Sequence, residues 1–271
     1  MFHIFRNTPL GRENLLQSAY FCEQVGDLTL TVYIPDHTQC AMYSNGAVVT
    51  ISLDASYTRH GETAVQHVEE ILCDRRFDHN YFVPTSFTAN DFPDIPSDWA
   101  VMACPRTIAS HVSRIGLDHI GPKVRSIVKH SPFPVFIPSA SFIPWKRICA
   151  FCGSTELGMN VIWQSHRLSA QTGAPLIMCT QGDDTSRADY EEKARLDSLS
   201  PDSTQVQVDW VTFDPGSLEE NLYAVPGDSL VVVGAAGETL MRELVFGSDL
   251  ETIQKTLPNP LLVVGPKAKL V

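Results

Sequence analysis

The chain has 271 residues, of which 44% are hydrophobic and 19% charged, a composition that excludes an intrinsically disordered protein. Its 20 basic and 31 acidic side chains give a formal net charge of −11, which argues against a dedicated nucleic-acid or anionic-membrane binder, because such proteins need a basic surface. We find no apolar run long enough for a membrane helix and no signal-peptide pattern at the start. The 7 cysteines are scattered, which is typical of reduced thiols, so we expect a cytoplasmic location.

The first half of the chain alternates between short apolar runs and helical patterns. Leu15, Ala19 and Cys22 recur at the spacing of one helix face, and residues 65–72 predict a second helix. Residues 47–53 are rich in β-branched side chains and predict an additional strand or a flap. We expect the other strands of this half at residues 3–6, 28–34, 81–87, 100–103 and 135–137.

The second half alternates in the same way. Leu157, Val161 and Leu168 share one face of a predicted helix, and Gly173 ends that helix because glycine readily adopts the backbone conformation that follows one. Strands that are apolar on both faces and separated by helices predict an α/β fold, with a mostly parallel sheet between helices. We expect further helices at residues 187–199 and 250–257, and strands at residues 147–151, 176–180, 206–213, 230–233 and 261–264.

The two halves are copies of one unit, because their residues match at nearly constant separations. Gly26 matches Gly173 at 147 residues, and Asp98 matches Asp228 at 130. A lysine and two prolines near the end of each copy match at 126: Lys129 with Lys255, Pro132 with Pro258, and Pro134 with Pro260. We therefore expect one domain over residues 1–140 and a second over residues 145–271, each long enough for a compact α/β domain.

The most informative motif follows the apolar strand at residues 230–233. Gly234 and Gly237 are separated by two residues, and nine more residues lead to Gly247 and Ser248. Glycine lets backbone N–H groups approach phosphate oxygens, and the start of a helix adds a partial positive charge. Open parallel sheets bind ligands at the carboxyl ends of their strands, so the motif predicts a phosphate site there.

With this motif the chain resembles the universal stress protein family, in its tandem two-domain form. The resemblance covers both halves and implies two five-stranded, mostly parallel sheets in the strand order 3-2-1-4-5. It also implies that Gly234, Gly237, Gly247 and Ser248 hold the phosphates of ATP or another adenine nucleotide. Family members act in stress tolerance, show no robust catalytic turnover and in some cases bind no nucleotide. The resemblance thus implies a stress-response protein without catalytic residues, capable at most of slow nucleotide hydrolysis.

The nucleoside end of the candidate site lies after the first two strands of the second copy. Gly153 and Ser154 are retained there, as in many nucleotide-binding members of the family. Cys152 stands where those members carry an aspartate, and Thr180 ends the second strand. These four residues complete the candidate nucleotide site of the second domain.

Two departures from the family pattern predict weak binding, restricted to the second domain. Glu238 and Asp249 add carboxylates beside the phosphates, and each opposes binding by ~1 kcal/mol at an effective dielectric constant of about 80. In the first copy, counting from the shared prolines puts Ile108, His111 and Pro122 at motif positions. We expect the insertion at residues 39–53 to cover the pocket that this copy has lost.

Each of these patterns also has a purely structural explanation. The motif glycines suit a strand-to-helix turn whether or not a ligand is present. Cys149 and Cys152 have the spacing of a redox pair, but the first lies inside a predicted strand, so we interpret both as buried thiols. His60 and His67 are interpreted as part of a solvated helix face. The cysteines and histidines do not form a zinc-type set, so no metal is expected.

Two functions therefore remain open. One is a stress-response protein that binds an adenine nucleotide, and the other is an interaction scaffold whose pockets are degenerate. Neither involves nucleic acid or a membrane. The last strands of the two copies, at residues 135–137 and 261–264, are apolar sheet edges, and we expect a homodimer or an intramolecular domain pair to cover them.

Overall fold

The computed structural model describes residues 1–44, 47–88, 91–106, 108, 120–152, 156–181, 206–213, 218–235 and 257–269. The chain divides into two compact units. Unit 1 consists of Met1–Phe142 together with Lys267–Lys269, and unit 2 of Ile143–Pro266. Within the described ranges, none of the helices has the length and apolar character needed to cross a membrane.

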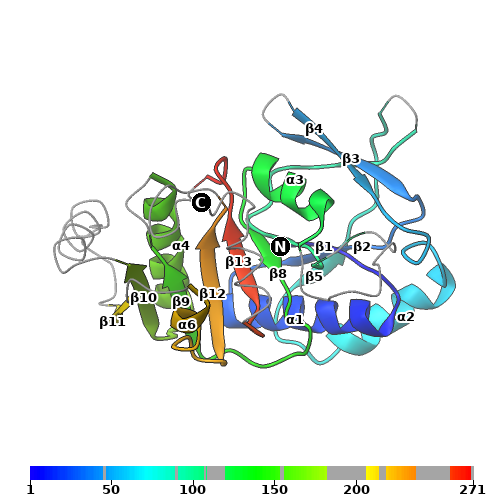
Figure 1. Cartoon of the computed structure of the whole chain (residues 1–271). Helices are drawn as coiled ribbons and strands as arrows, with labels where there is room; N and C mark the ends of the chain where they lie inside the picture. The colour runs from blue at the N-terminus through cyan, green and yellow to red at the C-terminus, as the bar shows by residue number, and fades with distance from the viewer. Residues whose placement is uncertain are drawn as a thin grey trace. The chain divides into compact units, whose positions relative to one another are not determined.

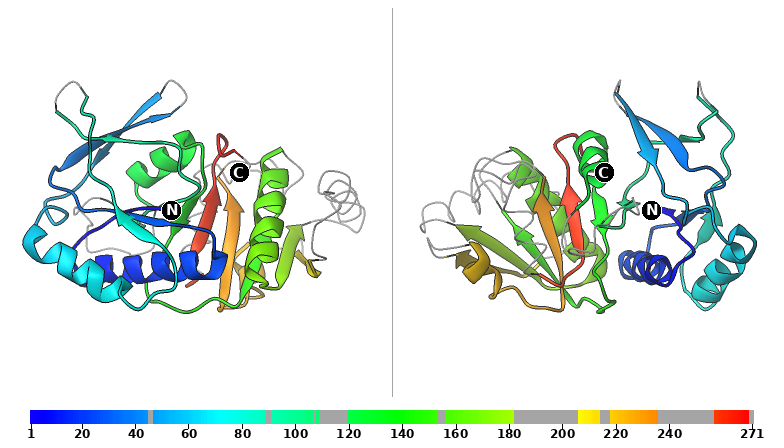
Figure 2. Two further views of the ribbon diagram at one scale, coloured as in Figure 1. Left: turned by 180° about the vertical axis from the view of Figure 1, so that it is seen from behind. Right: turned by 45° about the vertical axis from the view of Figure 1, so that its right-hand side comes forward.

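Unit 1 contains a parallel sheet in the order β5-β2-β1-β7-β8, which is 3-2-1-4-5 when its strands are counted along the chain (Figure 1). Figures 1 and 2 show α1 and α2 on one side of this sheet and α3 on the other. The elements are β1 (Phe2–Ile4), α1 (Pro9–Val25), β2 (Leu30–Tyr33), α2 (Gly61–Leu72), β5 (His79–Tyr81), β7 (Met102–Ala103), α3 (Pro122–His130) and β8 (Val135–Ile137).

A second, three-stranded sheet is inserted into unit 1. Strands β3 (Gln39–Ser44) and β4 (Ala47–Ser52) form an antiparallel hairpin, and β6 (Asp94–Ile95) pairs with β3 in parallel. The prediction of an additional strand at residues 47–53 is confirmed. The hairpin lies beside α3 in Figure 2. One face of this sheet is buried, and its apolar side chains are Cys40, Met42, Val49, Ile51 and Ile95.

Unit 2 repeats the same sheet order, with β11-β10-β9-β12-β13 all parallel. Helix α4 lies along one face of it (Figure 1). The predicted α/β class, with its mostly parallel sheets, is thus confirmed. The elements of unit 2 are β9 (Arg147–Phe151), α4 (Glu156–Thr172), β10 (Leu176–Gln181), β11 (Val208–Phe213), α6 (Leu218–Leu222), β12 (Ser229–Gly234) and β13 (Leu261–Val264).

The apolar sequence pattern explains the core of unit 2. Strands β12 and β13 are buried along almost their entire length, as continuous apolar runs in a covered parallel sheet should be. Helix α4 buries the predicted stripe of Leu157, Val161 and Leu168 against this sheet. Burial of such side chains stabilises the fold by roughly 1.5–3 kcal/mol each.

Helices α1 and α4 occupy equivalent places and have the same length, 17 residues. Each is followed by a glycine with positive φ, Gly26 at 84° and Gly173 at 68°. The N–H of each glycine donates to a carbonyl four residues earlier, at 2.9 Å. The separation of 147 residues predicted for this part of the repeat therefore matches the structure.

The fourth strands of the two sheets correspond at a slightly different separation from the predicted one. Met102 N–H donates to the carbonyl of Pro134 at 3.2 Å, and Val231 N–H donates to the carbonyl of Pro260 at 3.0 Å. Met102 thus occupies the place of Val231, 129 residues later, and the expected separation of 130 is wrong by one. The separation of 130 was counted between Asp98 and Asp228, which precede β7 and β12. The turn between aspartate and strand differs by one residue in the two units, and this difference changes the separation.

This register also changes which residue stands at the first motif position of unit 1. Gly234 ends β12 and pairs with Val264. At a separation of 129 residues its counterpart is Pro105, not Ile108. Proline has no backbone N–H, so unit 1 lacks a donor at this position.

Candidate functional site

Three residues of the predicted nucleotide site lie at the carboxyl edge of the sheet of unit 2, near the ends of β9, β10 and β12. Cys152, Thr180 and Gly234 are within the described residues: Cys152 follows β9, Thr180 is the penultimate residue of β10, and Gly234 ends β12. Gly153, Ser154, Gly237, Gly247 and Ser248, as well as Glu238 and Asp249, lie outside the described residues.

Gly234 has a packing reason to be glycine. A Cβ at this position would lie 3.1 Å from both Cγ and Cδ2 of Leu157 in α4, closer than ordinary van der Waals contact, and 3.5 Å from Cγ2 of Val161. The helix therefore packs directly on the last residue of the strand. This contact accounts for Gly234 without a ligand, so Gly234 alone does not decide between the structural and the phosphate-binding explanation.

Cys152 follows β9 and is held by its backbone, whose N–H donates to the carbonyl of Cys179 at 2.9 Å. Its side chain has no exposed surface, and its Sγ lies 3.2 Å from Sδ of Met178. Burial raises the pKa of this thiol, so it stays neutral at physiological pH. The position at which the resemblance to universal stress proteins implies an aspartate is therefore uncharged here.

Cys149 is also fully buried, and its Sγ lies 3.3 Å from Sγ of Cys179 on the neighbouring strand. In the register of β9 and β10, Cys149 and Cys179 point to one face of the sheet, and Cys152 points to the other. The interpretation of Cys149 and Cys152 as buried thiols rather than a redox pair agrees with this arrangement.

Thr180 is a buried polar residue at this edge of the sheet. It has no exposed surface, and its Oγ1 has no hydrogen-bond partner among the described residues. The alternation of β10 puts it on the same face as Met178 and Cys152. A buried hydroxyl without a partner costs about 1–3 kcal/mol, so a donor or acceptor supplied at this edge would stabilise it.

The corresponding edge of unit 1 carries an arginine. Phe5 N–H donates to the carbonyl of Tyr33 at 2.8 Å, just as Cys152 N–H donates to that of Cys179. Phe5 therefore corresponds to Cys152, and Arg6 takes the place of Gly153. The side chain of Arg6 leaves the carboxyl end of β1 at the position where the second copy has the start of its candidate site.

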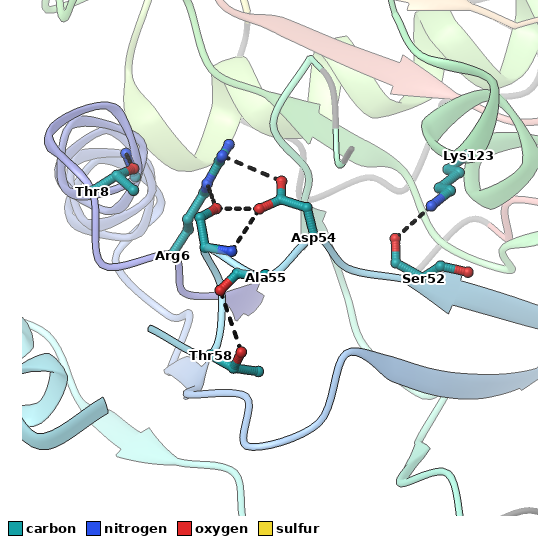
Figure 3. Close-up of polar contacts among 9 residues, drawn as sticks. Arg6, Thr8, Ser52, Asp54, Ala55, Thr58 and Lys123 are labelled. Atoms are coloured by element: carbon teal, nitrogen blue, oxygen red, sulfur yellow. Dashed lines mark hydrogen bonds and ion pairs between the residues drawn. The ribbon is translucent and has the colours of Figure 1, made fainter. Parts of the chain in front are cut away.

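Arg6 is bound by the segment that follows the inserted hairpin (Figure 3). Its Nη2 lies 3.2 Å from Oδ2 of Asp54, and its Nε donates to Oγ of Ser56 at 2.5 Å. The same carboxylate accepts hydrogen bonds from the backbone N–H and the hydroxyl of Ser56. The ring of Tyr57 packs against the guanidinium, 5.3 Å from its Cζ.

The hairpin is also attached to α3 by a second cation. Lys123, in the first turn of α3, donates from Nζ to the carbonyl of Ser52 at 2.7 Å, as Figure 3 shows. Asp54 is only two residues further on, so Arg6 and Lys123 hold the same short stretch, one from the connection after β1 and the other from α3. The expectation that the insertion covers this edge of the first copy agrees with these contacts.

A further polar cluster joins α1 and α2 beside this edge. Asn7 donates from Nδ2 to the carbonyl of His60 and to Oγ1 of Thr63, both at 3.0 Å. Nδ1 of His67 lies 2.8 Å from Oδ1 of Asn7, and 3.4 Å from Nη1 of Arg12. His60 is solvated as predicted, with its side chain 70% exposed, but the two histidines do not share one solvated helix face, because His60 precedes α2 and His67 contacts Asn7 and Arg12.

Sequence reasoning missed Arg6, Asp54 and Lys123 as a group. Arg6 contacts Asp54 across 48 positions, and Lys123 contacts Ser52 across 71, because the inserted hairpin folds back over the sheet edge. The position of the insertion after the second strand was the signal that could have found them. Within the described ranges, no group of three or more histidine, cysteine, aspartate or glutamate side chains is arranged to hold a metal ion.

Comparisons with known proteins identify the fold. No family model matches the sequence, and no curated protein matches it. A universal stress protein from Archaeoglobus fulgidus has a similar structure, with a TM-score of 0.65 over 97% of this chain and 98% of that one, at 12% identity. A putative universal stress protein from Pseudomonas aeruginosa gives a TM-score of 0.50 over 98% and 93%, also at 12% identity.

The same fold occurs in a protein of another kind. The cytoplasmic domain of a prokaryotic cation chloride cotransporter gives a TM-score of 0.50 over 97% of this chain and 93% of that one, at 8% identity. At such identities the likeness establishes the fold and not the activity. The resemblance to universal stress proteins that the glycine motif suggested is confirmed at the level of the fold.

Proposed function

We propose that the chain is a stress-response protein of the tandem universal stress type, which binds ATP or a related adenine nucleotide in unit 2. The observation that carries this proposal is the position of the glycine motif. Gly234 is the last residue of β12, at the carboxyl edge of a parallel sheet in the order 3-2-1-4-5. The direction in which successive strands are added to the sheet reverses between β9 and β12. Open α/β sheets bind nucleotides at such switch points.

In this proposal the phosphates are bound mainly by backbone groups. Gly247 and Ser248 present N–H groups and a hydroxyl to the phosphate oxygens, as in nucleotide-binding relatives. The buried hydroxyl of Thr180, which has no partner among the described residues, is available to the nucleoside side of the site. Cys152 adds no charge, because its thiol is neutral and buried. Glu238 and Asp249 lower the affinity by repulsion.

Unit 1 is proposed not to bind nucleotide. Pro105 stands in the place of Gly234, and Arg6 is engaged by Asp54 and Ser56 at the edge where a ligand would enter. The second candidate function, an interaction scaffold, is favoured by this closed edge. The outer face of the inserted hairpin also exposes Tyr43 and Val48, which are directly paired across the strands.

Calorimetric titration with ATP distinguishes the two functions. Gly247→Val should abolish binding, because a branched side chain fills the oxygen site. Ser248→Ala should weaken binding roughly 5- to 30-fold, as expected for one hydrogen bond to a charged group. Glu238→Arg should strengthen binding, and added salt should reduce this gain.

Gly227→Ala is the matched control, because a Cβ at this glycine of unit 2 would meet nothing within 4 Å. It should bind ATP as the parent does. Equal ATP affinity of the parent and Gly247→Val would refute the phosphate role of the motif. If the parent binds neither ATP nor a related adenine nucleotide, the scaffold function stands.

A further inference from the structure

We propose that the free edge of strand β4 in the inserted sheet is an interaction surface, and that its partner is the same strand of a second copy of this chain. The two strands pair antiparallel about a twofold axis and join the two inserted sheets into one. This homodimer uses neither of the last strands of the two units, β8 and β13. It goes beyond nucleotide binding by unit 2 and does not depend on it.

The first argument is that β4 has one free side. It is the terminal strand of the order β4-β3-β6, and among the described strands it pairs only with β3. Leu53 N–H donates to the carbonyl of Thr38 at 2.7 Å, which fixes the alternation of hydrogen-bonded pairs along the hairpin. By this alternation the backbone N–H and C=O groups of Val48, Thr50 and Ser52 point away from β3.

The fold itself covers one end of this free side. Lys123 of α3 donates from Nζ to the outward carbonyl of Ser52 at 2.7 Å. Among the described residues, no hydrogen bond reaches the outward backbone groups of Val48 and Thr50. Each of these two residues therefore offers one donor and one acceptor, which is the pattern that an added strand binds.

The second argument is that the side chains beside this open stretch are apolar and exposed. Val48 is 56% exposed, and Tyr43, its direct partner on β3, is 46% exposed. Thr50 is exposed on the same face, whereas Val49 and Ile51 are buried on the other. Figure 2 shows that the outer end of the hairpin extends beyond the main sheet of unit 1. A strand added to β4 would remove apolar surface from water at this end.

The third argument is the distribution of charge, and it identifies the partner. Between Asp36 and Asp54 the chain has no aspartate, glutamate, lysine or arginine, although 19% of all residues are charged. Sheet edges are commonly protected from pairing by charged side chains or proline, and β4 has neither. Two copies with a net charge of −11 each repel one another, and this uncharged hairpin is where they approach at the lowest cost.

Antiparallel pairing of two β4 strands is self-complementary. Val48 of one copy lies opposite Thr50 of the other, and the twofold axis repeats the same pair. The outward N–H and C=O groups of both residues are then used in hydrogen bonds between the copies. Because this contact occupies the same edge on both copies, the assembly closes at a dimer.

Sedimentation velocity of the full chain over a wide range of concentrations tests the proposal. The parent should change from monomer to dimer as the concentration rises. Thr50→Pro removes the outward N–H without removing a hydrogen bond to β3, so it should keep the fold and weaken dimerisation roughly 10- to 100-fold. Val48→Lys should abolish dimerisation, because it places a charge at the pairing edge of both copies.

Val65→Lys is the matched control, because Val65 is 50% exposed and belongs to α2. It makes the same change of side chain and should dimerise as the parent does. Thermal melts check that each variant is folded. If Thr50→Pro fails to fold, Val48→Lys decides, since its side chain replaces one that is already exposed.

Disulfide trapping tests the register in a Cys73→Ser background, which removes the exposed cysteine. A mixture of Val48→Cys and Thr50→Cys, oxidised with diamide, should form disulfide-linked dimers in higher yield than either protein alone, because the two positions face each other. Equal yields in the mixture and in the separate proteins would overturn the register.

Two results would overturn the dimer itself. A parent that stays monomeric at every concentration would exclude a second copy and leave a strand of another protein as the partner of this edge. Dimerisation that survives both Thr50→Pro and Val48→Lys would show that the copies meet elsewhere. All these variants lie in unit 1, so none of the results depends on whether the parent binds ATP.

Discussion

At the scale of single residues, buried ionisable groups tie the stability of the protein to pH. His3 lies in β1 and is only 4% exposed, and its Nδ1 is 2.9 Å from Oγ of Ser18. Loss of hydration lowers the pKa of His3 from 6.5 to about 3. The folded protein therefore keeps this imidazole neutral where an unfolded chain would protonate it.

The free energy of unfolding is expected to fall as the pH is lowered from 6.5 towards 3, because the unfolded state binds a proton that folded His3 does not. The slope contributed by His3 should be up to about 1.4 kcal/mol per pH unit. Urea unfolding at pH 7, 5 and 4 measures it. His3→Asn keeps a donor near Ser18 but does not titrate, so its free energy of unfolding should fall less steeply.

His37→Asn is the control for this experiment, because the side chain of His37 is 43% exposed whereas that of His3 is buried. Its pH dependence should follow that of the parent. Identical slopes for the parent and His3→Asn would show that His3 is not held neutral by burial.

At the scale of elements, the connection between β1 and α1 determines where Arg6 lies. Thr8 caps α1, with its hydroxyl accepting the Gly11 N–H at 3.1 Å, and Pro9 starts the helix. Gly11 lies so close to the preceding turn that an added Cβ would overlap the carbonyl oxygen of Arg6. The absence of a side chain at this position lets the backbone of Arg6 lie against the first turn of α1.

Gly11→Ala is expected to destabilise the protein by about 1–3 kcal/mol, because the new Cβ must push the backbone of Arg6 away. This is the opposite of the roughly 1 kcal/mol gain that alanine gives in an unhindered helix. Thermal melts measure the effect. The shift of Arg6 should also weaken its pairing with Asp54.

Gly61→Ala provides the comparison, since Gly61 opens α2 and a Cβ there would meet nothing within 4 Å. Its Tm should equal or exceed that of the parent. A Gly11→Ala protein as stable as Gly61→Ala would mean that the turn before α1 is free to relax.

At the scale of the whole molecule, the sheets of the two units have the same strand order but different residues at their carboxyl edges. Unit 1 fills its edge with Arg6, Asp54 and Ser56, and unit 2 keeps the sequence Gly234-x-x-Gly237 there. The two units thus share one strand order, which depends on many interchangeable apolar contacts, while their edges differ. Residues at a sheet edge carry little of the core, so they change at low cost to stability.

One ATP molecule per chain is therefore the expected stoichiometry in a calorimetric titration. Arg6→Met with Asp54→Asn should leave this number unchanged, because unit 1 still has Pro105 in place of the first motif glycine. Two equivalent sites per chain would contradict the difference between the units.

The α/β class and most of the strands could be predicted from the sequence alone. These follow from periodic burial, which acts over a few residues: the stripe Leu157, Val161 and Leu168 faces the core as predicted. The same reasoning located the inserted strand at residues 47–53, because β-branched residues between turn signals have few other places in a fold.

Only the tertiary structure decided the register between the copies and the contents of the two edges. The register follows from hydrogen bonds across strands, such as Met102 to Pro134, which one strand's sequence does not specify. Arg6 contacts Asp54 and Lys123 contacts Ser52 because the hairpin folds back, and a pattern of nearby residues cannot encode contacts across 48 and 71 positions. The energy of the ion pair between Arg6 and Asp54 depends on its burial, and the two side chains become buried only when the chain folds.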